Sequence, residues 1–242
     1  NTEKVSKIIA YAYKNAIPVT PFGSGTGVMG AAITTQGGIV ISTANINSFF
    51  LADADSHIGI VGSGMILEVV DEKLRDHGLM FGHDPWSRPI ASVGGAISTD
   101  GMGYLAGKFG SMGQQVLGLE IVIPNGDIIE TKGLTKSSGP NLSGLFIGSE
   151  GAMGLITKAK IYTPPVPELF KIVSYEFDNF IHGFEVIKNM YDLSFFPAVM
   201  DFAEELDPIT NSVNAILHIG FMGFEEKVKA ELSRSHKIII KG

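Results

Sequence analysis

Apolar residues in the N-terminal part of the chain recur first at helical and then at strand-like spacings. Apolar positions every three or four residues predict a helix over residues 2–16, with Thr2 as its N-cap. The same pattern predicts a second helix over residues 66–77, which Gly78 would stop. Asn125-Gly126 lies between two apolar runs and predicts the turn of a β-hairpin. Strands are expected over residues 17–20, 38–42, 50–52, 58–62, 116–123, 127–131 and 155–163.

The pattern changes after Pro164-Pro165-Val166-Pro167, where glycine becomes sparse. Beyond these prolines, the predicted strands and helices follow the order β-α-β-β-α-β, which is that of the ferredoxin-like split motif. The sequence therefore predicts two units with a boundary at the prolines. The six elements are expected over residues 171–177, 180–191, 198–203, 213–221, 225–235 and 237–240.

Composition and charge exclude several classes of function. The 242 residues carry 18 Lys and Arg against 25 Asp and Glu, and this net negative charge, without a basic cluster, argues against a nucleic-acid or membrane-surface partner. The chain has no cysteine, which excludes a disulfide framework, a thiolate metal site and cysteine catalysis. No apolar run is long enough to span a bilayer and no signal peptide is visible, so we expect a cytoplasmic protein. The histidines show no zinc-ligand spacing, so no metal site is expected.

Glycine is the unusual residue, with 30 copies, and the first dense segment is Gly23-Ser24-Gly25-Thr26-Gly27. Alternating glycines allow successive backbone N–H groups to point into one concavity, which suits a phosphate. The spacing Gly25-x-Gly27-x-x-Gly30 also matches the dinucleotide fingerprint of Rossmann folds. That motif must open a helix, and residues 31–42 are not helical in pattern, so the Rossmann interpretation is rejected. A glycine- and serine-rich surface loop is the alternative.

Two further segments carry the same composition. Residues 82–113 are rich in glycine and small hydroxyl side chains and have almost no periodicity, which predicts a long loop whose donors a flat ligand such as a flavin can use. Residues 148–156 form a short glycine turn that leads into a strand. The alternative for residues 82–113 is an ordinary long loop. The alternative for residues 148–156 is a tight connection without a binding role.

Taken together, three motifs resemble the FAD-binding domain of the vanillyl-alcohol oxidase / p-cresol methylhydroxylase (PCMH) superfamily. They are Pro21 to Gly27, Ser92-Val93-Gly94-Gly95-Ala96-Ile97-Ser98-Thr99 and Gly148 to Thr157, in the family's order and spacing. The resemblance covers about residues 2–167. It implies an α+β fold, with a PCMH-type FAD-binding domain over residues 1–165 followed by a partial ferredoxin-like α/β cap domain over residues 168–242.

The resemblance also implies the cofactor and the residues that bind it. Non-covalent FAD is expected, because Thr26 stands where covalent members carry a flavin-linking histidine. The first motif would bind the pyrophosphate, the second the pyrophosphate and isoalloxazine, and the third the adenine–ribose side. The implied cofactor-binding residues are Pro21, Phe22, Gly23, Ser24, Gly25, Thr26, Gly27, Ser87, Ser92, Gly94, Gly95, Ser98, Thr99, Glu150, Gly151, Gly154 and Ile156.

The branch of the superfamily determines the expected reaction. Resemblance to glycolate oxidase and D-lactate dehydrogenase-type enzymes implies transfer of a hydride equivalent from a small 2-hydroxy acid to FAD. Short matches at Gly82-His83-Asp84-Pro85, Ser138-Gly139-Pro140-Asn141 and Pro165-Val166-Pro167-Glu168 resemble alkyldihydroxyacetonephosphate synthase, a redox-neutral FAD transferase, instead. A third alternative is a non-catalytic FAD-binding subunit of a larger oxidase.

Candidates for direct chemistry are few. His83 lies in the second glycine-rich segment, and Arg88 can offset a substrate carboxylate or reduced flavin. In the D-2-hydroxy-acid branch, the resemblance places the acid/base and metal-binding histidines in later cap segments, so the chain is expected to be a fragment or to have gaps. The expected partners are a small hydroxy-acid substrate and either a second copy or a partner subunit.

Overall fold

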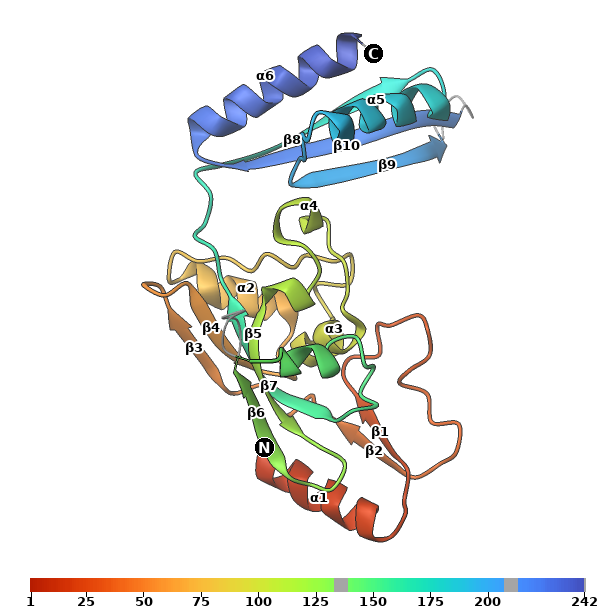
Figure 1. The fold of residues 1–242 in the computed structure, drawn as a ribbon, viewed down its shortest axis with the longest axis vertical. Coiled ribbons are helices and arrows are strands. Elements are labelled where there is room, and N and C mark those ends of the chain that lie inside the picture. The colour runs from red at the N-terminus through yellow and green to blue at the C-terminus, as the bar shows by residue number, and fades with distance from the viewer. Residues whose placement is uncertain (133–138, 207–212, 242) are drawn as a thin grey trace. The chain divides into compact units, whose positions relative to one another are not determined.

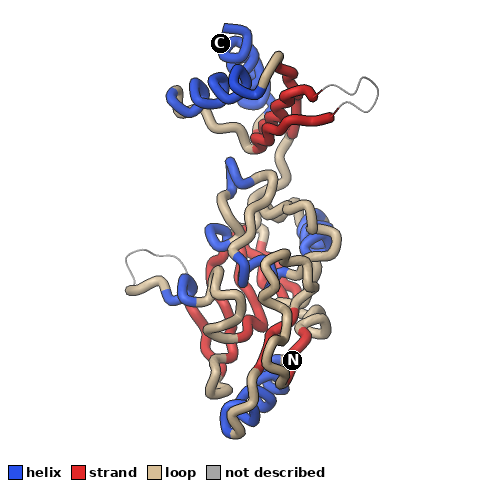
Figure 2. The backbone as a smooth tube through the Cα atoms, turned by 90° about the vertical axis from the view of Figure 1, so that its right-hand side faces the viewer, coloured by secondary structure: helices blue, strands red, loops and turns tan. Residues whose placement is uncertain are grey.

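The computed structural model describes residues 1–132, 139–206 and 213–241, which form two compact units. The first unit comprises Asn1–Gly103 and Gly110–Val166, and the second comprises Tyr104–Phe109 and the chain from Pro167 onward. Figures 1 and 2 show the elements of each unit. Within the described ranges, no helix combines the length and the apolar character needed to cross a membrane.

A five-stranded antiparallel sheet forms the centre of the first unit (Figure 1). Its core contains apolar residues of the sheet together with Leu67, Val70 and Leu74 of helix α2 and Val93 and Ile97 of helix α3. Both helices therefore pack on the sheet. The strand order is β3 (Phe50–Asp53), β4 (Ile58–Gly62), β7 (Leu155–Tyr162), β5 (Val116–Val122) and β6 (Ile128–Lys132), with α2 at Leu67–Arg75 and α3 at Val93–Thr99.

A smaller substructure precedes this sheet in the chain. Strands β1 (Val19–Phe22) and β2 (Ile39–Ser42) pair in parallel. Helix α1 (Thr2–Lys14) shares a small core with β2, because Val5 and Ile9 pack with Ile41. The chain between β1 and β2 is loop, drawn in tan in Figure 2.

The start of α1 corrects one expectation. The N-cap is Asn1, whose side chain accepts a hydrogen bond from the backbone N–H of Lys4, and not Thr2. The hydroxyl of Thr2 instead donates to Oε1 of Glu120, 2.6 Å away. A long-range partner for the hydroxyl thus overrides the local capping preference.

The region from Gly82 to Gly113 is also more structured than its lack of periodicity predicts. Ser92 caps helix α3, which buries Val93, Ala96 and Ile97. A helix of seven residues with two glycines is too short to give a clear periodic pattern. Further short elements are α4 (Ala106–Phe109) and the 3₁₀ turns Gly113–Gln115 and Leu142–Leu145.

The second unit has a three-stranded antiparallel sheet with the order β8-β10-β9. Alternate residues of β10, from Ala215 to Phe221, share a core with residues of both α5 and α6, so both helices cover the same face of the sheet. Helix α4 also belongs to this unit, and Lys108 Nζ donates to the backbone oxygen of Met222 over 2.7 Å. The elements are β8 (Leu169–Phe177), α5 (Phe180–Asp192), β9 (Val199–Leu206), β10 (Val213–Gly223) and α6 (Glu225–Lys241).

The strand predicted over residues 237–240 is wrong, because these residues continue helix α6. Three consecutive isoleucines favour a strand locally. However, Val228, Ser235 and Ile238 are all buried at helical spacing. Burial of this face against the sheet therefore decides the conformation.

Candidate cofactor site

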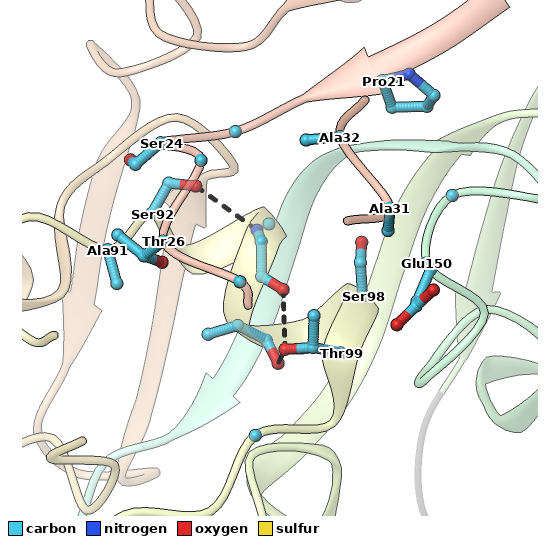
Figure 3. A pocket seen from close by; sticks show the side chains of 18 of the residues that line it. Pro21, Ser24, Thr26, Ala31, Ala32, Ala91, Ser92, Ser98, Thr99 and Glu150 are labelled. Carbon is cyan, nitrogen blue, oxygen red and sulfur yellow. Dashed lines mark hydrogen bonds between the residues drawn. The ribbon is translucent and has the colours of Figure 1, made fainter. Parts of the chain in front are cut away.

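Three glycine-rich segments that are far apart in the sequence meet at one cavity of about 480 Å³ in the first unit (Figure 3). They are the loop that follows β1, the segment around α3, and the turn before β7. The cavity is lined by all the residues that the resemblance implied for the cofactor: Pro21, Phe22, Gly23, Ser24, Gly25, Thr26, Gly27, Ser87, Ser92, Gly94, Gly95, Ser98, Thr99, Glu150, Gly151, Gly154 and Ile156.

The glycines allow these segments to approach closely. A Cβ atom built on Gly23 would lie 2.6 Å from Ser92 Oγ, which shows that the first loop lies directly against the start of α3. A Cβ on Gly94 would lie 2.8 Å from Cβ of Ser63. Side chains at these glycines would therefore disrupt the contacts that bring the segments together.

Helix α3 supplies polar groups whose orientation is fixed. Ser92 Oγ accepts from the backbone N–H of Gly95 over 3.3 Å, and Thr99 Oγ1 donates to the oxygen of Gly95 over 3.1 Å or of Ala96 over 3.3 Å (Figure 3). These bonds hold both hydroxyl oxygens in place at the cavity. Each hydroxyl can form a further bond with a ligand.

The charge of the lining limits how an anion can be held. None of the described residues that line the cavity is Lys or Arg, and Glu150 is the carboxylate among them. A bound phosphate would therefore be held by backbone N–H groups and hydroxyls instead of ion pairs. The glycine-rich loops on the cavity wall can supply such backbone N–H groups.

His83 is the ionisable ring in the lining and is only 2% exposed. Burial lowers the pKa of His83 to about 4, although the nearby charge of Asp100 acts in the opposite direction. The imidazole is therefore neutral near pH 7. Its buried Nδ1 atom has no hydrogen-bond partner among the described residues, so a ligand in the cavity could supply one.

The other candidate, Arg88, does not line the cavity. Its Nη2 atom lies 2.9 Å from Oδ2 of Asp71, which is nearly buried. The guanidinium is thus held by Asp71 of helix α2. Of the segment Ser138–Asn141, Ser138 lies outside the described residues.

Sequence reasoning missed several lining residues. The main group is Val28 to Ala32, of which Val28 is 95% and Met29 is 83% exposed. Exposed apolar residues directly after a glycine-rich loop indicate a protein surface that a ligand covers. The other missed lining residues are Thr43, Pro85, Ala91, Ala96, Gly101, Met102 and Leu155.

Comparison with known proteins gives the family. Residues 1–132 match the model of the FAD binding domain family. The chain belongs to this FAD-binding family. FAD is the family's cofactor, and the resemblance inferred from the three glycine motifs is confirmed. The cavity fits such a ligand, because glycines, hydroxyls and a neutral imidazole suit a large, anionic and partly flat dinucleotide.

Relatives of this FAD-binding chain include FAD-linked oxidoreductases. It is 30% identical to the glycolate oxidase subunit GlcD of Bacillus subtilis over 100% of its own length and 54% of the relative. It is 42% identical to a D-lactate dehydrogenase of Archaeoglobus fulgidus over 66% of its length and 36% of the relative. The chain thus spans about half or less of the length of these relatives.

A solved structure of alkyldihydroxyacetonephosphate synthase has the same fold. The TM-score is 0.87 at 20% sequence identity, over 99% of this chain and 49% of that one. The expected fold class, a PCMH-type FAD-binding domain in a mixed α and β chain, is confirmed.

Proposed function

We propose that this protein is an FAD-dependent dehydrogenase or oxidase that removes a hydride equivalent from a small 2-hydroxy acid such as D-lactate or glycolate. The observation that carries the proposal is the convergence of the three glycine motifs on one cavity. The names of the relatives, a glycolate oxidase subunit and a D-lactate dehydrogenase, support this substrate class.

In this proposal, residues 1–165 form the FAD-binding domain and residues 168–242 belong to a cap domain. The loop from Pro21 to Gly27 binds the pyrophosphate, and the segment from Ser87 to Thr99 binds the pyrophosphate and the isoalloxazine. Residues Glu150 to Ile156 bind the adenine–ribose side. FAD remains non-covalent, because Thr26 cannot form the histidyl link of covalent members.

The reaction converts the hydroxy acid to a 2-oxo acid, as the carbon loses a hydride and the hydroxyl loses a proton to a base, which the family resemblance places in later cap segments. Bound FAD would supply the acceptor for the hydride equivalent, while the protein would orient the reactants and exclude water. His83 is too weak a base to take the hydroxyl proton near pH 7, since its pKa is about 4. Its Nδ1 atom, which has no partner among the described residues, would instead form a hydrogen bond with the cofactor or substrate.

An anaerobic absorbance spectrum tests the proposal directly. D-lactate or glycolate is added to the FAD-loaded protein without oxygen, and bleaching of the flavin bands supports hydroxy-acid oxidation. Bands that persist with a broad panel of 2-hydroxy acids would contradict it. Acid precipitation of the same sample tests the mode of attachment, and the flavin is expected in the supernatant.

The segment Gly82-His83-Asp84-Pro85 favours a second candidate, a redox-neutral transferase like alkyldihydroxyacetonephosphate synthase. His83 and Pro85 of this segment line the cavity. This candidate predicts exchange of the acyl group of an acyl dihydroxyacetone phosphate for a fatty alcohol, without an electron acceptor. Absence of the ether product would eliminate it. Flavin that responds only when a partner protein is added would instead indicate a non-catalytic subunit.

A further inference from the structure

Asp71 lies on helix α2 and joins three parts of the first unit through one buried carboxylate. Its side chain is 2% exposed. The Oδ1 atom accepts from the backbone N–H of Phe81 over 2.7 Å. The Oδ2 atom accepts from Nε of Arg75 over 2.8 Å and from Nη2 of Arg88 over 2.9 Å.

Phe81 and Arg88 are the two ends of a loop that faces the cavity. Between them lie His83, Pro85 and Ser87, all of which line it. Asp71 therefore holds both ends of the loop with a single side chain. Neither Asp71 nor Arg88 lines the cavity.

The backbone at the start of α2 adds two more bonds to the same segment. The N-terminus of α2 has no side-chain cap, and the N–H groups of Leu67 and Glu68 donate to the carbonyl oxygens of Ala91 over 2.9 Å and Arg88 over 3.3 Å. Unpaired N–H groups at a helix start need such partners. Helix α2 thus serves as the support against which residues 81–91 fold.

We propose that Asp71 and Arg88 are positioning residues for the flavin, because their ion pair fixes the loop that brings His83 and Ser87 to the cofactor. The proposal rests on the assignment of the cavity to FAD and does not depend on which hydroxy acid is oxidised. Removal of the Arg88 side chain would leave a buried carboxylate with one fewer partner and remove one of the bonds that hold this end of the loop. The consequence is a misplaced loop in an otherwise folded domain.

Arg75 provides a matched control. It binds the same Oδ2 atom of Asp71, but it lies one turn away on the same helix and has no such bond to the loop. Arg75→Gln and Arg88→Gln therefore each remove one guanidinium from the same carboxylate. Only Arg88→Gln removes the link to the loop.

The experiment compares wild-type protein with Arg75→Gln, Arg88→Gln, Asp71→Asn and Arg88→Lys. The dissociation constant for FAD is measured by fluorescence titration, the visible spectrum of bound flavin is recorded, and the melting temperature is measured without FAD. We expect Arg88→Gln and Asp71→Asn to weaken FAD binding about tenfold and to shift the flavin spectrum. Arg75→Gln should stay within about twofold of wild type with an unchanged spectrum.

Arg88→Lys keeps the positive charge but lacks the planar fork, so its FAD affinity should lie between those of wild type and Arg88→Gln. If Arg88→Gln does not fold, a weaker FAD affinity of Arg88→Lys than of wild type, beside an unchanged affinity and spectrum of Arg75→Gln, carries the test. Equal FAD affinities for the Arg75 and Arg88 variants would overturn the positioning role. Wild-type protein that binds no FAD would overturn the cavity assignment as well, which separates the two failures.

Discussion

Gly151 lies directly against Pro21, so the first and third glycine motifs touch. A Cβ atom built on Gly151 would lie 2.8 Å from Cγ of Pro21 and 3.3 Å from its Cβ. Gly151 also has a φ of +85°, in the left-handed region that favours glycine. This contact joins the proposed pyrophosphate and adenine ends of the cavity.

Gly151→Ala should therefore harm both folding and FAD binding. The left-handed conformation alone costs an alanine about 1–2 kcal/mol, and the added methyl also has to displace the ring of Pro21. We expect a lower melting temperature without FAD and FAD binding weakened at least about tenfold, measured by fluorescence titration.

Gly37→Ala is the matched control for this variant. Gly37 has a φ of +70°, but a Cβ there would have no neighbour within 4 Å, and Gly37 does not line the cavity. It should lower the melting temperature without changing the FAD affinity. Similar loss of FAD binding in both variants would show that the Pro21 contact has no specific effect.

The buried imidazole of His83 predicts a pH-dependent stability of the protein without cofactor. Burial lowers the pKa of His83 from 6.5 to about 4 in the folded state, so between these values the unfolded chain binds more protons. Stability therefore falls as the pH decreases through this window, by up to about 3 kcal/mol. The free energy of unfolding, measured by urea denaturation from pH 7 to pH 4, checks this expectation.

His83→Asn should remove this contribution, since it cannot be protonated in this range. His77→Asn, at an exposed position on the same unit, is the control and should retain the wild-type slope. Parallel pH curves for wild type and His83→Asn would refute the assignment of the slope to His83.

The hydrogen bonds of Glu120 lead to a second prediction about stability, at a residue that does not line the cavity. Its carboxylate accepts from Thr2 and Thr157, each at 2.6 Å, and from Lys158 Nζ at 2.7 Å. Glu120→Gln should lower the free energy of unfolding by about 1–3 kcal/mol, because these donors lose a charged acceptor. Urea denaturation at pH 7 measures the difference.

The pH dependence of this effect has a definite sign. Burial raises the pKa of Glu120, but the bonds from Lys158, Thr157 and Thr2 outweigh it, and the net pKa lies below the ordinary 4.5. The stabilisation is therefore present above about pH 4.5 and lost as the pH falls through the lowered pKa. The exposed Glu130→Gln on β6 is the control, and an equal loss in both variants would count against the network.

FAD itself should stabilise the protein, because it binds the folded chain and not the unfolded one. At a hundredfold excess over its dissociation constant, the gain is about 2.7 kcal/mol. Thermal melts with and without FAD should therefore differ by several degrees, and melts with riboflavin test whether the ADP part of FAD contributes. Equal melting temperatures with and without FAD would contradict binding in this cavity.

The sequence reveals the candidate site better than it reveals the local structure around it. At positions 23, 94 and 151, other parts of the chain approach the backbone so closely that only glycine fits. The glycines are therefore visible in the sequence even though their contact partners are distant in the chain. Periodicity does not indicate a role for the exposed Val28 and Met29, because apolar residues in a loop have no periodic context.

Other features depend on tertiary contacts that local patterns do not contain. Ile238 belongs to a helix because it packs with Val228 in the core of the second unit, although its neighbours favour a strand. Asp71 occupies a buried position of α2 between Val70 and Leu74. A carboxylate on the apolar face of a predicted helix was the available signal, but its partners Phe81 and Arg88 are visible only in the fold.

Residues Tyr104–Phe109 belong to the second unit, although the chain on both sides of them belongs to the first. The backbone therefore passes between the units three times: after Gly103, after Phe109 and after Val166. A cut at the prolines would leave the N-terminal fragment carrying α4, which packs as part of the other unit through Lys108 and Met222. The second unit thus cannot be separated from the first by a single cut in the chain. Exchange of the C-terminal unit between relatives requires a compatible α4 as well, so the two segments are constrained to change together.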